Sequence, residues 1–162
     1  MQFHPFEPII FDDSKVLILG TFPSIRSFEN NFYYAHPRNQ FWNILSKVFN
    51  YDIDTREDKI KLLKKHKIAL WDIIKECERV NSSDTNLNNI TPNDIKGLLN
   101  SYPNIKYIAF TSKTAQKIYN HEFKDLNVKN FYLPSPSPAY ARMSFDKKFE
   151  IYKNIFIDLS II

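Results

Sequence analysis

The residues best suited to chemistry lie together in the segment GTFPSIRSFENNFYYAHPRNQFW, residues 20 to 42. It combines the imidazole of His36, the carboxamide of Asn39 and the phenols of Tyr33 and Tyr34. An imidazole exchanges a proton near neutral pH, and a carboxamide is both donor and acceptor, so it can orient a water molecule or the edge of a base. The segment therefore combines groups for proton transfer, hydrogen bonding and aromatic stacking.

The start of this segment, from Gly20 to Ser24, follows an apolar run. Glycine permits close backbone approach, and Pro23 with Ser24 favours a turn whose amides face a ligand. The stretch lacks the further glycines of a dinucleotide fingerprint and the GK[ST] of a phosphate-binding loop. GxSxG is absent, so Ser24 with His36 is only a limited candidate for nucleophile and base. An ordinary strand exit is the alternative interpretation.

Two of these residues also have structural interpretations. Asn39 immediately precedes an amphipathic pattern that begins at Gln40, and asparagine caps helices well, so spacing alone favours the cap over a role in catalysis. His36 stands before Pro37 and can serve as a structural hydrogen-bonding group. Both interpretations stay open at the level of residue spacing.

Composition limits the remaining chemistry. The 162 residues suit one domain, residues 1–162, and 22 basic against 18 acidic side chains give a net charge of +4, which permits a polyanionic partner. Cys77 is the single cysteine, so no internal disulfide and no thiolate metal site can form, and a small buried hydrophobe is expected there. We predict no metal and no cofactor. Without a signal-like start, a long apolar run or heptads, we expect a cytoplasmic monomer.

Strands and helices alternate along the chain. Four apolar runs predict buried strands: residues 15–19, 68–73, 105–110 and 130–133. Apolar spacing predicts helices over residues 40–49, 57–65, 112–119 and 145–159, and a further helix through Leu99, with Thr91 as its N-cap, Pro92 in its first turn and Asp94 after it.

This alternation predicts an α/β fold, a three-layer domain with a central, mainly parallel four-stranded sheet flanked by helices. Ligands bind such sheets beyond the carboxyl ends of the strands. The segments that follow the first and last strands are long and rich in proline, which is more than chain reversal requires. We therefore expect the functional rim at that end of the sheet.

Four motifs in order resemble a known family. LGTFPS, then YYAHPRNQFW, then ALWDIIKECER with Ser82, Ser83 and Asp84 after it, and finally LPSPSPAYA are similar to signatures of the uracil-DNA glycosylase superfamily, specifically its hypoxanthine-DNA (deoxyinosine) glycosylase branch. The mismatch-specific uracil glycosylases are similar in the AHPxNxFW portion. The resemblance covers about Val16 to Arg142, nearly the whole domain.

The resemblance implies a DNA-repair hydrolase that removes a deaminated base, with hypoxanthine first and uracil or xanthine as further candidates. It assigns the pocket lining to Gly20, Thr21, Phe22, Pro23 and Ser24, and catalysis to Asn39 instead of a first-motif asparagine, because Phe22 stands at that position. Under this interpretation Asn39 positions the water and His36 donates to the leaving base, while Phe22, Tyr33 or Tyr34 stacks on the base.

The last motif, from Leu133 to Ala139, is expected to press on the DNA backbone of a double-stranded substrate. The expected DNA-binding residues are Ser135, Ser137, Pro138, Ala139, Tyr140 and Arg142. Pro136 departs from the family pattern, where a hydroxyl residue is more frequent. No lysine is evident for Schiff-base chemistry, so a monofunctional glycosylase that leaves an abasic site is expected.

Two other functions fit the residues without the resemblance. A non-catalytic nucleic-acid-binding module would use the same basic and aromatic rim and would bind DNA without releasing a base. A hydrolase of free nucleosides would act on inosine and leave DNA intact.

Overall fold

The structure, a computed structural model, describes residues 1–79 and 87–162. The Ser82, Ser83 and Asp84 part of the third motif lies outside the described residues. All four predicted strands are present and form one parallel sheet in the order β3-β2-β6-β7. Their bounds are β2 Val16–Gly20, β3 Ile68–Asp72, β6 Tyr107–Phe110 and β7 Lys129–Tyr132. The prediction of a parallel four-stranded α/β sheet is confirmed.

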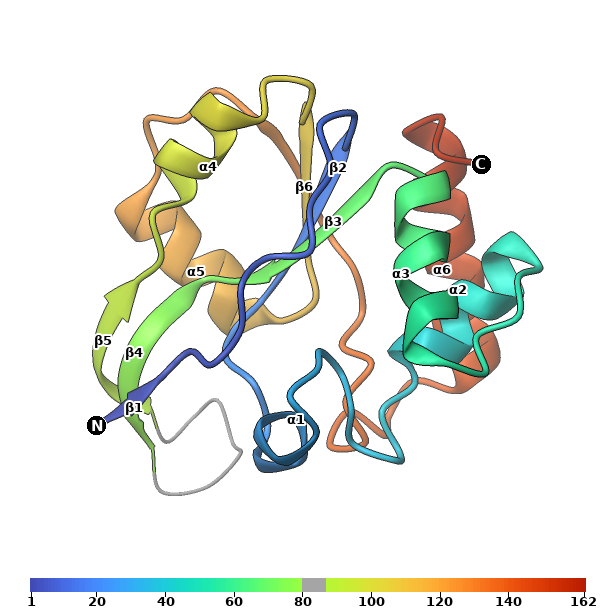
Figure 1. Ribbon diagram of the computed structural model, residues 1–162, viewed down its shortest axis with the longest axis horizontal. Helices are drawn as coiled ribbons and strands as arrows, with labels where there is room; N and C mark the ends of the chain where they lie inside the picture. Colours follow the sequence, from blue (N-terminus) through green and yellow to red (C-terminus); the bar gives the residue numbers. More distant parts are fainter. Residues whose placement is uncertain (80–86) are drawn as a thin grey trace.

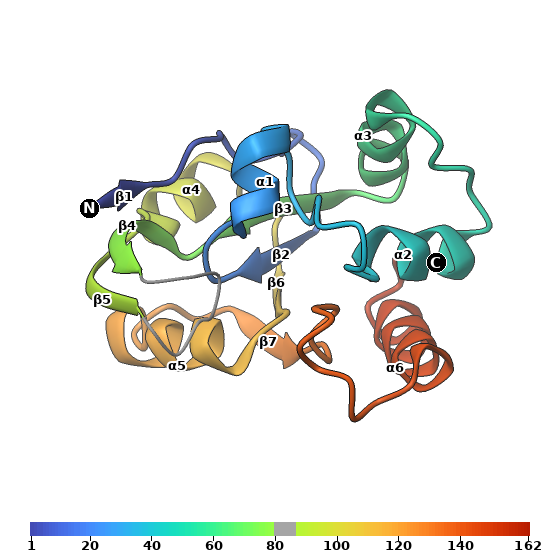
Figure 2. The same cartoon turned by 90° about the horizontal axis from the view of Figure 1, so that it is seen from below.

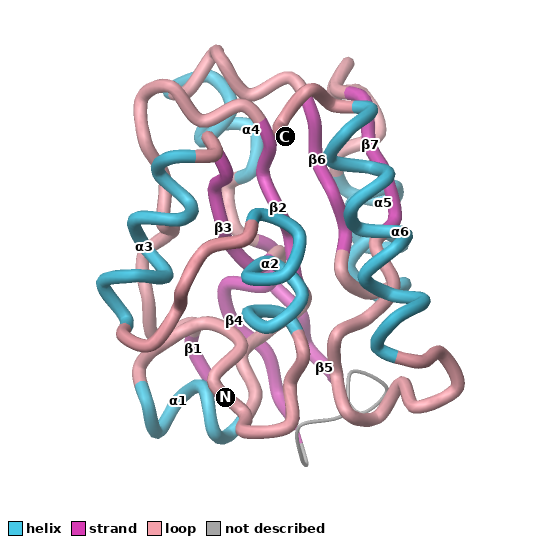
Figure 3. The backbone as a smooth tube through the Cα atoms, turned by 90° about the vertical axis from the view of Figure 1, so that its right-hand side faces the viewer, coloured by secondary structure: helices cyan, strands magenta, loops and turns pink. Residues whose placement is uncertain are grey.

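Helices cover both faces of this sheet (Figure 1). Successive β2 side chains point to opposite faces, so Val16 and Ile18 belong to one apolar cluster and Leu17 and Leu19 to another. The first cluster lies under α2 (Phe41–Phe49), α3 (Arg56–Lys65) and α6 (Phe145–Asp158), the helices in front of the sheet in Figure 3. The second lies under α4 (Ile95–Ser101) and α5 (Lys113–Glu122). This arrangement gives the three predicted layers.

Local sequence explains where several helices begin. Thr55 and Asp58 form a reciprocal capping box that opens α3, and the hydroxyls of Ser112 and Ser144 accept hydrogen bonds from the first turns of α5 and α6. The buried stripe predicted on α6 is confirmed at Tyr152 and Phe156, which are fully buried. These helices therefore begin within two residues of their predicted positions.

The prediction for the fourth helix was partly wrong. Thr91 does not cap it, because Thr91 and Pro92 end the strand β5 (Leu87–Pro92), where Thr91 pairs with Glu76 of the neighbouring strand. Asp94 is the N-cap instead, and its carboxylate accepts a hydrogen bond from the Gly97 N–H over 2.9 Å. Strand pairing with a distant segment, which residue spacing does not report, displaced the predicted start by three positions.

A second sheet was not predicted. It is antiparallel, in the order β1-β4-β5, and is built from β1 (Gln2–Phe3), β4 (Ile74–Arg79) and β5. The polar and charged residues of β4 and β5 hid these strands from a search for apolar runs. Cys77 of β4 is buried in the apolar core, as expected of a small buried hydrophobe.

The short helix α1 (Ile25–Asn30) was also missed, because its residues were expected to be loop. In Figure 1 it lies below the carboxyl end of β2, together with the segment that leaves β7, and Figure 2 views the molecule from that side. Within the described residues, no helix is both long and apolar enough to cross a bilayer.

Candidate active site

The exits of three parallel strands are joined by hydrogen bonds that extend the sheet ladder. The Ile73 N–H donates to the Gly20 carbonyl over 2.8 Å and the Thr111 N–H to the Leu19 carbonyl over 3.2 Å. The Leu133 N–H donates to the Phe110 carbonyl over 2.7 Å, which brings the fourth strand exit to the same edge. Segments distant in sequence therefore meet at one end of the sheet.

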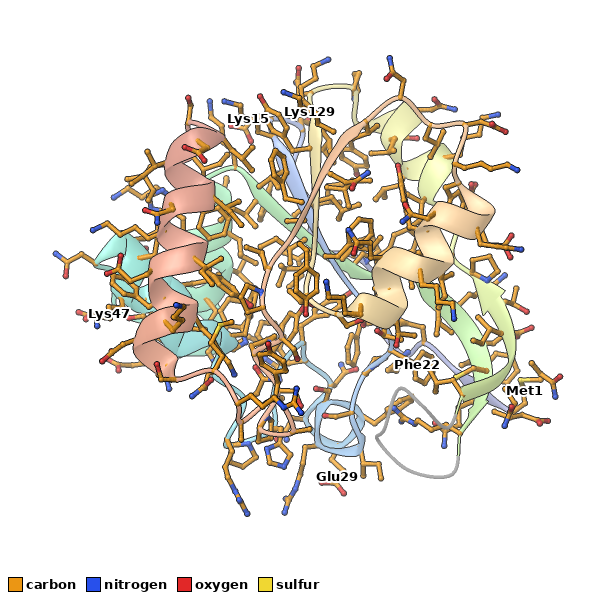
Figure 4. All side chains as sticks on the ribbon, turned by 180° about the vertical axis from the view of Figure 1, so that it is seen from behind. Met1, Lys15, Phe22, Glu29, Lys47 and Lys129 are labelled. Atoms are coloured by element: carbon orange, nitrogen blue, oxygen red, sulfur yellow. The ribbon has the colours of Figure 1, made fainter. Side chains whose placement is uncertain are left out.

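A pocket opens at this edge. It is lined by Gly20, Thr21, Phe22, Pro23, Ser24, Ser27, Tyr33, Tyr34, Asn39, Asp72, Thr111, Ser112, Ser135, Pro136 and Ser137. Phe22 is at this end of the molecule in Figure 4, and Lys15 and Lys129, which lie next to the opposite strand ends, are far from it. All predicted substrate-binding residues and Asn39 are among the lining residues, together with two of the predicted DNA-binding residues.

Gly20 lies very close to two side chains of the pocket wall. A Cβ atom added there would lie 2.5 Å from the Asp72 Oδ1 and 3.2 Å from the Tyr34 hydroxyl. Contacts below 3.0 Å are repulsive, so only glycine fits between these two side chains. The glycine is thus required by space, since its backbone has no positive φ.

Three aromatic rings form much of the wall. Tyr34 stacks on Phe41 with ring centroids 3.9 Å apart, and its hydroxyl lies 2.9 Å from the Thr111 Oγ1. Tyr33 is buried and donates its hydroxyl hydrogen to the Glu7 carbonyl over 2.8 Å. Burial, and then the nearby Asp72 charge, raise the pKa of Tyr33, so this phenol stays protonated. Tyr33 and Tyr34 are therefore fixed before any ligand enters.

Phe22 is one of the residues that the resemblance assigns to the pocket lining, and it lines the pocket. Its ring is buried, with the Arg79 guanidinium 5.0 Å from its centroid and the Phe28 ring at 5.6 Å. Arg79 also donates to the Pro23 carbonyl. The ring supplies an apolar wall in place of a polar group.

Asn39 combines the two interpretations that spacing left open. Its Oδ1 accepts a hydrogen bond from the Phe41 N–H over 2.9 Å, which caps the first turn of α2. Its Nδ2 makes no hydrogen bond within the described residues, and the residue lines the pocket. The cap holds the carboxamide in one orientation, which leaves the second lone pair of Oδ1 and both Nδ2 hydrogens for a ligand.

His36 is not brought into the pocket. Its Nδ1 accepts a hydrogen bond from the Arg38 N–H over 3.1 Å, and its carbonyl accepts one from the Asn39 N–H over 2.9 Å. The ring borders a neighbouring surface hollow with Arg56 and Lys59. His36 therefore shapes the turn before Asn39, and the geometry offers no support for proton transfer into the pocket.

The last motif contributes hydroxyls at the pocket and exposed residues beyond it. Ser135 and Ser137 line the pocket, and each side-chain oxygen accepts a hydrogen bond from the backbone N–H two residues later, over 3.2 Å. Their hydroxyl hydrogens stay available to a phosphate. Pro138, Ala139 and Arg142 are exposed outside the lining. Tyr140 is half-buried.

Pro136, where the resemblance led us to expect a hydroxyl residue, makes a backbone contact with the segment that carries Asn39. The Pro136 carbonyl accepts a hydrogen bond from the Gln40 N–H over 2.9 Å. Because only the backbone oxygen takes part, the contact does not depend on a side-chain hydroxyl. It joins the last motif directly to the residue after Asn39.

A buried lysine makes a second connection between these segments. Lys148 is 1% exposed, and its Nζ donates to the Gln40 Oε1 and the Tyr140 carbonyl, each over 2.9 Å. Burial lowers the pKa of Lys148. Lys148 does not line the pocket. Its hydrogen bonds instead hold the segments of Gln40 and Tyr140 in place.

Four residues of the site were given no role by sequence reasoning: His4, Asp72, Thr111 and Ser112. Asp72 lies near the end of the predicted strand 68–73, and Thr111 and Ser112 follow the predicted strand 105–110, so their positions were the available signal. The Thr21 and Ser112 hydroxyls hydrogen-bond across the strand exits. No local sequence pattern pointed to His4, because His4 and its partner Asp72 are 68 residues apart in the chain.

Comparisons with known proteins identify the family of the chain. The profile of the Uracil DNA glycosylase superfamily matches residues 8–160. The chain therefore belongs to the uracil DNA glycosylase superfamily. It is 30% identical to a protein of Methanosarcina acetivorans over 90% of this chain and 92% of the relative, and 32% identical to one of Methanosarcina barkeri over 91% and 94%. Both relatives are named hypoxanthine DNA glycosylase.

A solved structure is also similar. The solution NMR structure of a Methanosarcina acetivorans protein, provisionally described as a uracil DNA glycosylase, superposes with a TM-score of 0.82 at 29% identity and covers 96% of each chain. The similarity in sequence and in fold thus extends over nearly the entire chain.

Proposed function

We propose that this protein is a monofunctional DNA glycosylase that removes a deaminated base, hypoxanthine first, from double-stranded DNA and leaves an abasic site. The observation that carries the proposal is the convergence of Gly20–Ser24, Asn39 and Ser135–Ser137 on one pocket at the carboxyl edge of the sheet. The two relatives named hypoxanthine DNA glycosylase support the choice of base.

Access to the scissile bond requires base flipping. A glycosidic bond inside stacked DNA is out of reach, so the nucleotide must leave the helix, at a cost of a few kcal/mol that is least for a mispaired base. Deaminated bases are mispaired, which favours them before any pocket contact. Exposed Arg142 and the hydroxyls of Ser135 and Ser137 would hold the backbone phosphates without reading sequence.

The pocket then stabilises the reacting groups. The aromatic wall of Phe22 and Tyr34 offers apolar surface to the base. As the bond breaks, the sugar becomes cation-like and the base gathers negative charge, so preset dipoles favour the transition state. Asn39, oriented by its bond to Phe41, would hold the attacking water. No lysine lines the pocket within the described residues, which supports hydrolysis without a Schiff base.

The test is base release from duplexes that each contain one deoxyinosine, deoxyuridine or deoxyxanthosine. The unaltered chain is compared with Asn39→Ala, with thermal unfolding to show that the variant is folded. Hypoxanthine release that the folded variant loses supports the proposal. DNA binding without release would select the binding module, and release only from free inosine would select a nucleoside hydrolase. Strand cleavage coupled to base release would contradict the monofunctional mechanism.

A cytoplasmic location and a monomeric state belong to this proposal as well. Size-exclusion chromatography with light scattering tests the second directly. A dimer whose interface covers the pocket would contradict access of a duplex to the site.

A further inference from the structure

Two buried side chains, His4 and Asp72, form a hydrogen-bonded pair at the pocket wall. The His4 Nε2 lies 2.8 Å from the Asp72 Oδ2, and the two side chains are 4% and 7% exposed. Asp72 ends β3 and pairs in register with Gly20 at the end of β2. The N-terminal segment is held there by β1 and by the His4 N–H, which donates to the Lys75 carbonyl over 2.7 Å. His4 is thus held beside the pocket wall by residues of β4.

The hydrogen bonds of His4 determine how many protons the pair holds. Its Nδ1 lies 2.8 Å from the Phe6 carbonyl oxygen. A carbonyl has no hydrogen to donate, so this contact is a hydrogen bond when Nδ1 carries one. The Phe6 N–H also lies 3.4 Å from Nδ1, a longer contact that a bare Nδ1 would accept, and our inference takes the shorter contact, with Nδ1 protonated.

With Nδ1 protonated, a second proton lies between His4 and Asp72. With Nδ1 protonated, a neutral imidazole would turn a bare Nε2 lone pair toward the Asp72 oxygen at 2.8 Å, which is repulsive if the carboxyl is ionised. The contact is attractive as imidazolium with carboxylate, or as neutral imidazole with carboxylic acid. Either way the pair stores one proton beyond those of a neutral histidine and a carboxylate.

The other carboxyl oxygen faces the pocket. Asp72 lines it, and Oδ1 would lie 2.5 Å from a Cβ at Gly20, which places this oxygen against the glycine. The bonds of Asp72 within the described residues use Oδ2 and the backbone carbonyl, which accepts from Asn93. Oδ1 is therefore the atom through which the pair can meet a ligand.

Several groups face the pair from the surrounding elements. The phenols of Tyr33 and Tyr34 come from the segment after α1, and Tyr33 is near enough for the Asp72 charge to raise its pKa. The Arg79 guanidinium of β4 lies over the Phe22 ring, whose centroid is 6.0 Å from that of the His4 ring. Glu7 presents its carbonyl to Tyr33, and its side chain is exposed. Lys75 likewise has an exposed side chain.

We propose that the His4–Asp72 pair is the proton donor to the leaving base, and this inference rests on the proposed function. The reaction balances as follows. The bond from the sugar C1′ to the base nitrogen breaks, and its electron pair goes to the base. The proton stored by the pair passes from the Asp72 carboxyl to a ring nitrogen of the base. The water oxygen bonds to C1′, and the proton that this water loses returns to the pair.

Hypoxanthine needs such a donor because a purine leaves poorly as an anion and well as a neutral base. A positioned acid contributes about 10²- to 10⁴-fold to such a step. The role that sequence reasoning assigned to His36 thus has a candidate whose geometry reaches the pocket.

The first test measures single-turnover release of hypoxanthine across a pH series. We expect Asp72→Asn to lose about 10²-fold or more. The His4→Gln side chain can hydrogen-bond to Asp72 but cannot store the proton. For His4→Gln we expect the rate of hypoxanthine release to fall by about tenfold or more. We also expect this rate not to decrease as the pH rises, in contrast to that of the unaltered chain. His121→Gln, on the exposed part of α5, is the matched control. An unchanged His4→Gln rate and profile would overturn the proposal.

The second test separates proton transfer from a positioning role. A 7-methyldeoxyinosine duplex carries a base that is already cationic and leaves as a neutral molecule without a proton. We expect Asp72→Asn to slow this substrate far less than deoxyinosine, relative to the unaltered chain. Equal losses on both substrates would show that Asp72 only positions the base, and the proposal would fail.

The third test does not depend on activity. Imidazole ¹⁵N shifts of the unaltered protein should show His4 protonated at Nδ1 and sharing a proton at Nε2, with the second signal changed in Asp72→Asn. A bare Nδ1 would overturn the pair whether or not the protein is a glycosylase. If the ¹⁵N result holds and the unaltered chain releases no base, the proposed function fails on its own.

Discussion

The Oδ1 atom of Asn39 accepts a hydrogen bond from the backbone N–H of Phe41, with 2.9 Å between the heavy atoms. One side chain thereby closes the first turn of α2 and faces the pocket that it lines. Structure and chemistry are coupled at this residue, because the same bond that stabilises the helix sets the direction of the carboxamide. Substitutions that keep one function and remove the other can separate them.

Asn39→Ser and Asn39→Ala should differ in stability and agree in activity. Serine caps helices nearly as well as asparagine, whereas alanine loses the cap and costs about 1 kcal/mol in the free energy of unfolding. Neither side chain can orient water as a carboxamide does, so both should slow hypoxanthine release by roughly a hundredfold. Urea denaturation and single-turnover kinetics measure the two effects. A fully active Asn39→Ala would leave Asn39 with the helix cap alone.

Gly20→Ala should damage the site through contact. The new methyl group would lie 2.5 Å from the Asp72 Oδ1, and because Asp72 is buried and bonded to His4, it has little room to move. A displacement of about 1 Å at a reacting group can cost about 10²-fold in rate. Gly97→Ala is the matched control: its methyl group meets the exposed carboxylate of Asp94, which is not among the residues that line the pocket. Comparable losses in both variants would contradict a local effect at the pocket.

Arg142→Ala should weaken DNA binding equally on all sequences. Arg142 is exposed beside the last motif, so its guanidinium is available to a phosphate. The loss of one phosphate contact should reduce the slope of log K against log salt by about 1. Fluorescence anisotropy over a salt series measures it. Lys129→Ala removes an equal charge next to the opposite end of the sheet, and an identical change in slope there would show a general charge effect.

The stability of the fold should depend on His66 at mildly acid pH. Burial lowers the pKa of His66 below 6.5; the nearby Lys65 charge lowers it further, and a backbone hydrogen bond with Ile161 opposes both. As pH falls through 6.5, the unfolded chain binds a proton that the folded protein does not, so the free energy of unfolding decreases until the folded pKa is passed.

His66→Phe should lose this dependence. The phenyl ring can keep the stacking on Phe49, whose centroid is 4.0 Å from that of the imidazole, and it does not titrate. Urea midpoints of the unaltered chain should fall relative to those of the variant from about pH 8 to about pH 5. A constant difference between the two proteins over this range would contradict the assignment. His121→Gln, a change at an exposed histidine, controls for general effects.

The sequence by itself determined the parallel sheet and the rim where the site lies. The four apolar runs and the helix patterns are local signals, since burial on both faces and a periodic apolar stripe are written in neighbouring residues. Gly20, Asn39, Ser135 and Ser137 could be placed near one another because parallel strands end at the same edge.

Only the tertiary structure decided which side chains meet there. His36 is three residues before Asn39 and still lies outside the pocket lining, because the turn directs its ring toward Arg38 and the neighbouring hollow. His4 reaches Asp72 because β1 pairs with β4. Polar strands such as β4 lack the apolar pattern from which strands are predicted. Contacts between segments 68 residues apart depend on the path of the whole chain, which local residue preferences do not encode.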